Sequence, residues 1–298
     1  TVSVGVAAAP DDAWDRATLI AACEHALRAA KRRGGNCVVG YSRALAVASA
    51  LESSMAVDID KFIALEATIE ARSFDYAYQP IVDAVSHEPI AYEALCRPRD
   101  PIFAGPADLF ETAEYAARLV ELGRACRLVS TTPMDRLPES CALFINLHPR
   151  ELDPSLLHEE AVRRWARRFV FEITETAAIE DYDRVRAVIA TLRESGCRIA
   201  LDDLGAGYAG LNSLAQLQPD FVKLDMALVR RIHTKSSTRR LVKHILEFCA
   251  AESIPVISEG VETAEEYDMV RQIGCPLMQG DYLAAPGPAF PQVRPLPE

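Results

Sequence analysis

Eight short strand-like runs, most of them separated by helical stretches, constrain the fold of this chain more than any other feature. In order, the runs are YAYQPIV, IAYEALC, ALFINL, RFVFEIT, RIALDD, DFVKLD, PVISEG and PLMQGDYL. The helical patterns lie near residues 107–131, 155–167, 181–195, 209–217, 235–252 and 262–273. Such an alternation is typical of an α/β fold and predicts a TIM-like (β/α)8 barrel.

The first two runs are joined differently from the rest. Only five residues, Ala84 to Glu88, separate them, which is too few for a helix but enough for a hairpin. We therefore expect the first strand to run antiparallel to the second, so that the barrel is a modified one.

Residues 1–41 have a pattern of their own. TVSVGVA alternates as a half-buried strand does, and CVVGY has the composition of a second short strand. Between them, one helical face is formed by Leu19, Cys23, Ala26, Leu27 and Ala30. This predicts a small N-terminal β-α-β segment, too small to fold alone. We expect residues 42–58 to be a helical linker and residues 59–298 to form the main domain.

Charge and cysteine content limit the class of function. A formal net charge of -11 argues against a groove for a nucleic-acid polymer, because phosphate binding needs a strongly basic surface. The eight cysteines are scattered without CxxC spacing, as expected of reduced thiols. No apolar run approaches the roughly 20 residues of a transmembrane helix. We expect a cytoplasmic chain, and a membrane anchor further upstream stays open.

Polar residues stand at the ends of the predicted strands. They are Glu93, Asn146, Glu172, Asp202, Asp203, Lys223, Asp225, Glu259 and Gln279. Because the strand ends of such a barrel meet at one mouth, these side chains should share one pocket. Taken singly, a strand-end Glu could be a salt bridge, Asn146 a turn residue and Lys223 a surface lysine. The cluster, rather than any one member, indicates a functional site.

Several carboxylates in one pocket repel one another unless a cation compensates them. Oxygen ligands are those that Mg²⁺ and Mn²⁺ prefer, and no His or Cys set has zinc spacing. The acids are numerous enough for two ions with one bridging carboxylate. Two such ions activate a water and stabilise the leaving oxygen in phosphodiester cleavage.

Seven motifs resemble those of EAL-domain cyclic di-GMP phosphodiesterases. They are YEALCR, FINLHP, FEITET, LDDLGAGYAGL, DFVKLD, SEGVET and MQGDYLAAP, in the family's order, over about residues 60–288. The resemblance implies a modified (β/α)8 barrel with an antiparallel first strand. It also implies hydrolysis of cyclic di-GMP to linear pGpG with two Mg²⁺ or Mn²⁺ ions.

The same resemblance implies the metal ligands. Glu93, Asn146, Glu172 and Asp202 would hold one ion. Asp202 would bridge to a second ion that also uses Asp203.

Further roles carry over in the same way. Glu259 would support the metal-bound waters, and Lys223 would orient or help to deprotonate the attacking water. Glu93 belongs to this catalytic group, and Glu175 resembles the acid that fixes the mobile loop after the fifth strand. The residues implied to contact the substrate are Gln79, Leu95, Arg97, Asp225 and Gln279.

The loop after the fifth strand departs from the family pattern DDFGTGYSSL. Leu204, Ala206, Ala209 and Gly210 stand where that pattern has Phe, Thr, Ser and Ser. None of them is an implied metal ligand, so the departure predicts different gating rather than lost chemistry. EAL domains often dimerise near this loop, and the resemblance therefore implies a homodimer.

The first 41 residues are similar to the C-terminal end of a GGDEF diguanylate cyclase domain, through SVGVA and HALRAAKRRGGN. The signature loop is missing, and Arg28 and Gly35 replace the Tyr and Arg usual there. We therefore expect no cyclase activity from this segment. A cyclase-like and sensory region further upstream is compatible with the resemblance.

Two other classes of function stay open. The first is a catalytically silent cyclic di-GMP receptor, although silent members usually lack a metal ligand and this chain retains all those placed above. The second is a glycosidase, because paired carboxylates on a barrel also serve that chemistry. A glycosidase has no need of Asn146, Lys223 or the Asp202–Asp203 pair.

Overall fold

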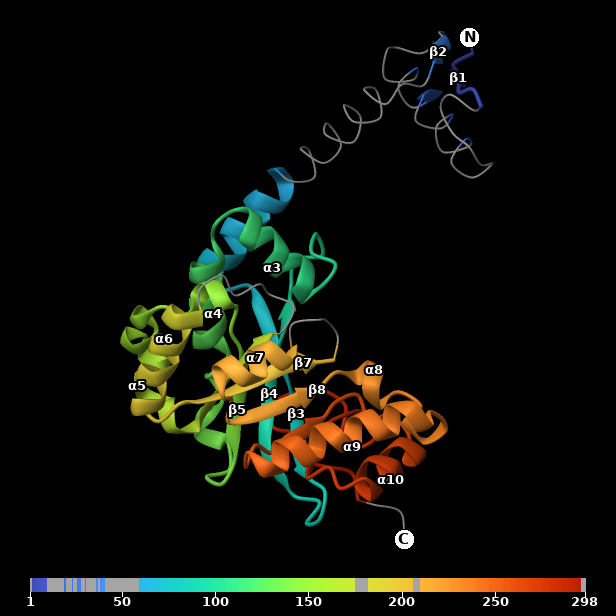
Figure 1. Ribbon diagram of the computed structural model, residues 1–298. Coiled ribbons are helices and arrows are strands. Elements are labelled where there is room, and N and C mark those ends of the chain that lie inside the picture. The colour runs from blue at the N-terminus through green and yellow to red at the C-terminus, as the bar shows by residue number, and fades with distance from the viewer. Residues whose placement is uncertain are drawn as a thin grey trace. The chain divides into compact units, whose positions relative to one another are not determined.

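The computed structural model describes residues 2–9, 19, 23, 26–27, 30, 36, 38–40, 59–174, 182–205 and 210–295 (Figure 1). The chain divides into two compact units, Thr1–Glu66 and Ala67–Glu298. Within the described ranges, no helix has both the length and the apolar character needed to cross a membrane.

The first unit contains two short parallel strands, β1 (Val4–Val6) and β2 (Val38–Gly40). Between these strands, the residues predicted to form the apolar face of a helix are helical in the structure. Two of them, Ala26 and Ala30, are buried. Gly5 lies so close to this helix that a Cβ atom would clash with its backbone at Cys23 and Leu27. The predicted β-α-β arrangement is present, whereas the predicted linker, 42–58, lies outside the described residues. Residues 59–71 are helical.

The second unit is a closed barrel with the strand order β10-β3-β4-β5-β6-β7-β8-β9. The strands are β3 (Phe74–Asp83), β4 (Pro89–Pro98), β5 (Ala142–Asn146), β6 (Phe169–Thr174), β7 (Arg198–Leu204), β8 (Phe221–Leu224), β9 (Val256–Ser258) and β10 (Leu277–Met278). β3 pairs antiparallel with both of its neighbours, and all other pairs are parallel. The modified barrel with an antiparallel first strand is confirmed.

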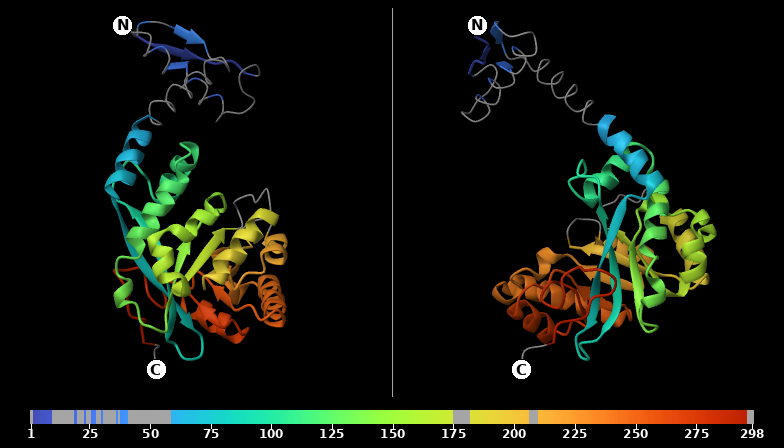
Figure 2. Two further views of the ribbon diagram at one scale, coloured as in Figure 1. Left: turned by 90° about the vertical axis from the view of Figure 1, so that its left-hand side faces the viewer. Right: turned by 180° about the vertical axis from the view of Figure 1, so that it is seen from behind.

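The β3–β4 hairpin is longer than its sequence pattern indicated (Figure 2). Its tip is the predicted five-residue loop, in which the Asp83 carboxylate accepts hydrogen bonds from Val85 N (2.9 Å) and Ser86 N (2.7 Å). At the other end the antiparallel ladder continues to the pair Phe74–Pro98. Glu93 was expected at the end of its strand, and this was wrong, because the ladder carries β4 five residues further.

Helices surround the barrel (Figure 1). They are α3 (Pro106–Tyr115), α4 (Leu119–Ser130), α5 (Glu160–Trp165), α6 (Tyr182–Glu194), α7 (Gly210–Leu217), α8 (Met226–Val229), α9 (Ser236–Ala251) and α10 (Ala264–Gln272). Short 3-10 turns are η1 (Met134–Arg136), η2 (Pro149–Glu151), η3 (Pro154–His158), η4 (Ala166–Arg168) and η5 (Ile232–Thr234).

Two predicted helices are broken. The stretch 107–131 divides into α3 and α4 because Ala117 adopts a left-handed backbone conformation (φ 55) that no helix continues through. After this break, α4 turns its face with Leu119, Leu122 and Cys126 into the core. The stretch 155–167 divides into η3, α5 and η4.

Candidate active site

Each barrel strand carries an apolar residue in the barrel interior and a polar residue two positions further toward the mouth. The apolar residues are Ile81, Ala91, Phe144, Val170, Ala200, Phe221, Ile257 and Leu277. We call their polar counterparts the polar layer: Gln79, Glu93, Asn146, Glu172, Asp202, Lys223, Glu259 and Gln279. Because side chains two apart on a strand point to the same face, both sets line the barrel interior. Seven of the eight were predicted as strand-end residues of one pocket, whereas Gln79 was named only as a substrate contact implied by the resemblance.

Lys223 lies at the centre of the polar layer. Its Nζ atom is 2.6 Å from Glu172 Oε1, 2.7 Å from Glu259 Oε1, and 3.2 Å from both Glu93 Oε2 and Asp202 Oδ1. An ammonium group has three hydrogens and one charge, so it cannot satisfy four carboxylates. The cluster therefore holds more negative charge than its own lysine balances.

The pKa values reflect this imbalance. Burial and the neighbouring Glu93 raise the pKa of Glu172 well above its ordinary range. Burial raises the pKa of Glu259 to about 8, against the attraction of Lys223. Burial would lower the pKa of Lys223, but the surrounding carboxylates outweigh it and raise that pKa well above its ordinary value. The lysine stays charged, and the acids compete for protons or for another cation.

Buried carboxylate oxygens with few partners indicate that a further cation fits here. Glu172 Oε2 is buried without a hydrogen-bond partner, and the shared Lys223 ammonium is the only cation beside Glu172 Oε1 and Asp202 Oδ1 among the described residues. Oxygens of Asp202, Asp203 and Glu259 also lie within 4.8 Å of one another. Oxygens so placed are the donor set that Mg²⁺ and Mn²⁺ prefer, so the residues present fit divalent ions.

A bulge in β7 explains how two consecutive acids reach one pocket. Neighbouring residues of a regular strand point to opposite faces. The pairing of β7 with β8 shifts register between Leu201 and Leu204, and Asp203 has a left-handed backbone (φ 59). Asp202 and Asp203 therefore line the same cavity. Burial and the Asp202 charge raise the pKa of Asp203 to about 6.

Amide side chains hold Glu93 from two sides. Gln279 Nε2 donates to Glu93 Oε2 at 2.6 Å, and Asn146 Nδ2 donates to Glu93 Oε1 at 3.3 Å. Gln279 Nε2 also lies 3.1 Å from Gln79 Oε1, which joins the first and last strands of the barrel. Burial raises the pKa of Glu93, but Lys223 and these amides outweigh it and keep that pKa below its ordinary value.

The mouth above the polar layer is a cavity of about 320 Å³. Among the predicted substrate contacts, Gln79, Leu95, Asp225 and Gln279 line it. Arg97 does not. It is exposed and lines an adjoining cavity of about 380 Å³ together with Asn146. Glu175 lies outside the described residues.

Six further residues of this cavity were not predicted: Met226, Gly260, Glu262, Gly280, Asp281 and Pro286. They come from the segments that follow β8, β9 and β10. The loops at the carboxyl ends of barrel strands build the mouth of such a barrel. The segments SEGVET and QGDYLAAP follow two of these strands, so their residues could have been assigned to the mouth from the sequence. Asp281 accepts a hydrogen bond from Gln79 Nε2 at 3.3 Å, so it also orients a member of the polar layer.

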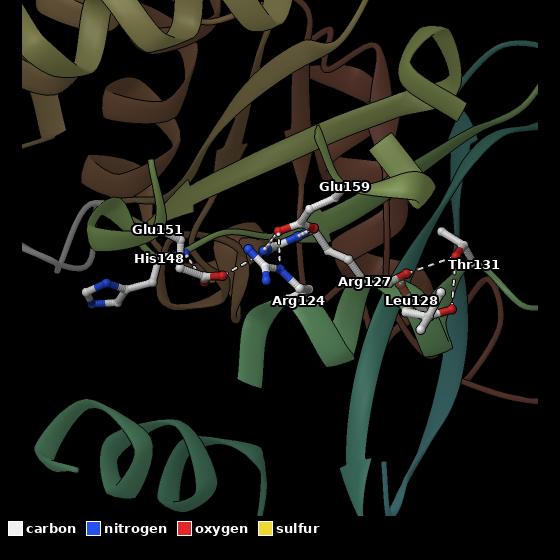
Figure 3. Close-up of polar contacts among 8 residues, drawn as sticks. Arg124, Arg127, Leu128, Thr131, His148, Glu151 and Glu159 are labelled. Carbon is white, nitrogen blue, oxygen red and sulfur yellow. Dashed lines mark hydrogen bonds and ion pairs between the residues drawn. The ribbon is translucent and has the colours of Figure 1, made fainter. Parts of the chain in front are cut away.

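A buried ion-pair network holds the turn that follows Asn146 (Figure 3). Arg127 of α4 donates to Glu151 Oε2 (2.7 Å) and forms two hydrogen bonds with Glu159, at 2.7 and 2.9 Å. Glu151 in turn accepts from the backbone N of His148 at 3.1 Å. Gly123 permits this approach, because a Cβ atom there would clash with the Glu151 carboxylate. The network fixes the turn directly after β5.

The variant Arg127→Met is expected to lower the free energy of unfolding by about 3–5 kcal/mol, because it leaves the buried Glu151 carboxylate without a cation and removes two hydrogen bonds to Glu159. The matched control is Arg124→Met. The Arg124 side chain is 58% exposed and contacts Glu159 only at 3.5 Å. The free energy of unfolding of Arg124→Met should therefore fall by no more than about 1 kcal/mol, as for other surface ion pairs. Urea denaturation measures both variants. Equal losses would contradict the assigned role of the buried network.

The comparison with protein families matches residues 63–286 to the EAL domain. The chain belongs to the EAL domain family. This EAL protein is 28% identical over 301 residues to the "Cyclic di-GMP phosphodiesterase NbdA" of Pseudomonas aeruginosa, a match that covers 97% of this chain and 38% of that protein. It spans between 36% and 53% of the length of four curated relatives.

Two solved structures are also similar. A standalone versatile EAL protein from Vibrio cholerae, in its c-di-GMP bound form, is 30% identical with a TM-score of 0.64, and the match covers 74% of this chain and 95% of that one. BlrP1 of Klebsiella pneumoniae, in a manganese/cy-diGMP complex, is 31% identical with a TM-score of 0.63, covering 72% and 56%.

Proposed function

We propose that this EAL domain hydrolyses cyclic di-GMP to linear pGpG with two divalent ions, Mg²⁺ or Mn²⁺. The observation that carries the proposal is a set of four carboxylates around one lysine, three of them buried and Glu259 partly exposed, with Asp203 beside them. Relatives described as cyclic di-GMP phosphodiesterases and the c-di-GMP and manganese complexes of similar proteins support it.

The proposed metal ligands are Glu93, Asn146, Glu172, Asp202, Asp203 and Glu259. When bound, the ions activate the attacking water and stabilise the leaving oxygen. Glu93 is held in one orientation by its two amide donors, which prepares it as a ligand. Lys223 donates hydrogen bonds from Nζ and orients the attacking water. Glu175 is proposed to fix the loop after β7.

The substrate is proposed to lie in the cavity at the barrel mouth, against Gln79, Leu95, Asp225 and Gln279. Arg97, beside the adjoining cavity, is proposed to bind a phosphate, because its planar guanidinium matches phosphate oxygens. Its Nη1 atom donates to its neighbour's carbonyl oxygen, Cys96 O, at 2.9 Å, so an approaching phosphate would have to compete for that donor.

A silent receptor for cyclic di-GMP is the second candidate. The altered loop at Leu204, Ala206, Ala209 and Gly210 bears on it only through the gating of turnover, because none of these residues is a proposed metal ligand. A single assay separates the two. The protein is incubated with cyclic di-GMP and Mg²⁺ or Mn²⁺, the products are separated by chromatography, and binding is measured in parallel by calorimetry. Linear product is the expected result. Tight binding without turnover would establish the receptor, and neither binding nor turnover would reject both.

Two finer proposals concern the surroundings of the barrel. Residues 1–41 are proposed to be the C-terminal remnant of a GGDEF-like domain without cyclase activity, so GTP should yield no cyclic di-GMP. The protein is proposed to form a homodimer near the loop after β7, and sedimentation in solution would show a monomer if this is wrong.

A further inference from the structure

A second group of titratable side chains lies outside the polar layer, between the hairpin and α4. Tyr76 on β3 faces Cys96 on β4 in the strand register, and Cys126 lies on the buried face of α4. The two cysteines are 8% and 5% exposed. The proposed chemistry of the barrel uses none of the three.

The two cysteines line the same cavity. The thiol of Cys126 is the largest of the causes that lower the pKa of the Cys96 thiol. The neighbouring Arg97 acts in the same direction. The pKa of Cys126, in contrast, is raised well above its ordinary value by the neighbouring Cys96 thiol and by burial. Of the pair, Cys96 is therefore the better nucleophile, and Cys126 is placed to react after it.

Both thiols are reachable through a cavity. Cys96 and Cys126 line the cavity of about 380 Å³ that also contains Arg97, Asn146 and His148. A space of this size admits molecules much larger than water, which needs only about 15 Å³. A small hydroperoxide can therefore meet the Cys96 sulfur without unfolding of the barrel.

We propose that Cys96 and Cys126 are a modification site, at which a hydroperoxide forms a reversible disulfide that ties β4 to α4. The Cys96 sulfur attacks one peroxide oxygen, so that an S–O bond forms, the O–O bond breaks, and the leaving oxygen departs with the thiol proton as water or alcohol. The Cys126 sulfur then attacks the sulfenic acid, an S–S bond forms, and the S–O bond breaks with loss of a second water. The two thiols lose two electrons, and the peroxide gains them.

The disulfide acts on the barrel mouth through the sequence neighbours of Cys96. Leu95 lines the mouth cavity on one side of it, and Arg97 lies on the other. A disulfide holds its Cβ atoms about 3.8 Å apart, so the bond would set the separation of β4 and α4 beside these two residues. This consequence rests on the proposed function. Because a displacement of about 1 Å can cost about 100-fold in rate, we expect kcat/KM for cyclic di-GMP to fall by about tenfold on oxidation.

The test uses the whole chain and hydrogen peroxide as the probe. After oxidation, free thiols are blocked, the protein is digested, and the peptides are analysed by mass spectrometry. We expect a linked pair of peptides containing Cys96 and Cys126, the loss of two of the eight thiols, and full recovery with dithiothreitol. Free thiols throughout, or irreversible oxidation of Cys96 with Cys126 still free, would overturn the proposal.

Three variants sharpen the result. Cys126→Ala should leave Cys96 as a sulfenic acid that dimedone traps, and Cys96→Ala should leave Cys126 unoxidised. The matched control Cys249→Ala removes another buried thiol, on α9, and should form the same linked peptides as the unaltered protein. If the link forms and kcat/KM is unchanged, the effect on the mouth is rejected. If the reduced protein has no turnover, the proposed function fails, and the linked peptide still decides the modification site.

Discussion

In the variant Asp202→Asn, the rate of hydrolysis of cyclic di-GMP is expected to fall by about 10³-fold. This is the upper end of what one electrostatic group contributes to catalysis. The side chain keeps its shape but loses its charge. In the folded protein the Oδ1 atom of Asp202 is buried beside Lys223 Nζ at 3.2 Å, and one oxygen of Asp202 lies within 4.8 Å of oxygens from Asp203 and Glu259. An amide in this place supplies one oxygen ligand at most and cannot balance the charge of two ions.

The measurement is the initial rate at saturating Mn²⁺, with thermal unfolding in parallel to show that the barrel is intact. Glu247→Gln is the matched control, because Glu247 lies on α9 and is 57% exposed. It also removes one carboxylate charge, and it should leave the rate unchanged. A rate for Asp202→Asn close to that of the control would remove Asp202 from the proposed metal site.

In chelator, the variant Lys223→Met is expected to be about 3–5 kcal/mol less stable than the unaltered protein, because it removes the cation from a buried ion cluster. Four carboxylates then face one another without their central ammonium group. A divalent ion can take over part of this charge. Mn²⁺ at 100 times its Kd should restore about 2.7 kcal/mol.

Urea denaturation at pH 8, with chelator or with Mn²⁺, measures this effect. Lys243→Met is the matched control, since Lys243 is 62% exposed and reaches Glu247 only at 3.9 Å. Its free energy of unfolding should change by no more than about 0.5 kcal/mol under either condition. If Lys223→Met unfolds like the control, or if Mn²⁺ adds no stability to it, the cluster does not have the excess negative charge assigned to it.

Most of the polar layer could be predicted because it repeats one signal on every strand. The two-residue spacing between an apolar and a polar side chain can be recognised even where the end of a strand is predicted wrongly. Glu93 is an example, because it was assigned to the right layer although β4 continues past it. The hairpin was predictable from a loop too short for a helix. Both signals are local in the sequence.

What could not be predicted depends on distances between segments. Nothing in DFVKLD shows that Lys223 contacts four carboxylates from four other strands. The cavity that Cys96 and Cys126 share likewise depends on how α4 packs against the hairpin after the left-handed turn at Ala117. Arg127 has the sequence appearance of a surface residue, yet its side chain is only 1% exposed.

The two-residue spacing between the apolar interior and the polar layer limits how this domain can change during evolution. A single inserted residue within a strand would turn a carboxylate outward and an apolar side chain toward the mouth, since strand side chains alternate. Insertions that spare the site are therefore confined to the segments between the strands. Variation in substrate handling and regulation should accumulate in those segments, at positions such as Met226 and Glu262, while the lengths of the eight strands stay fixed.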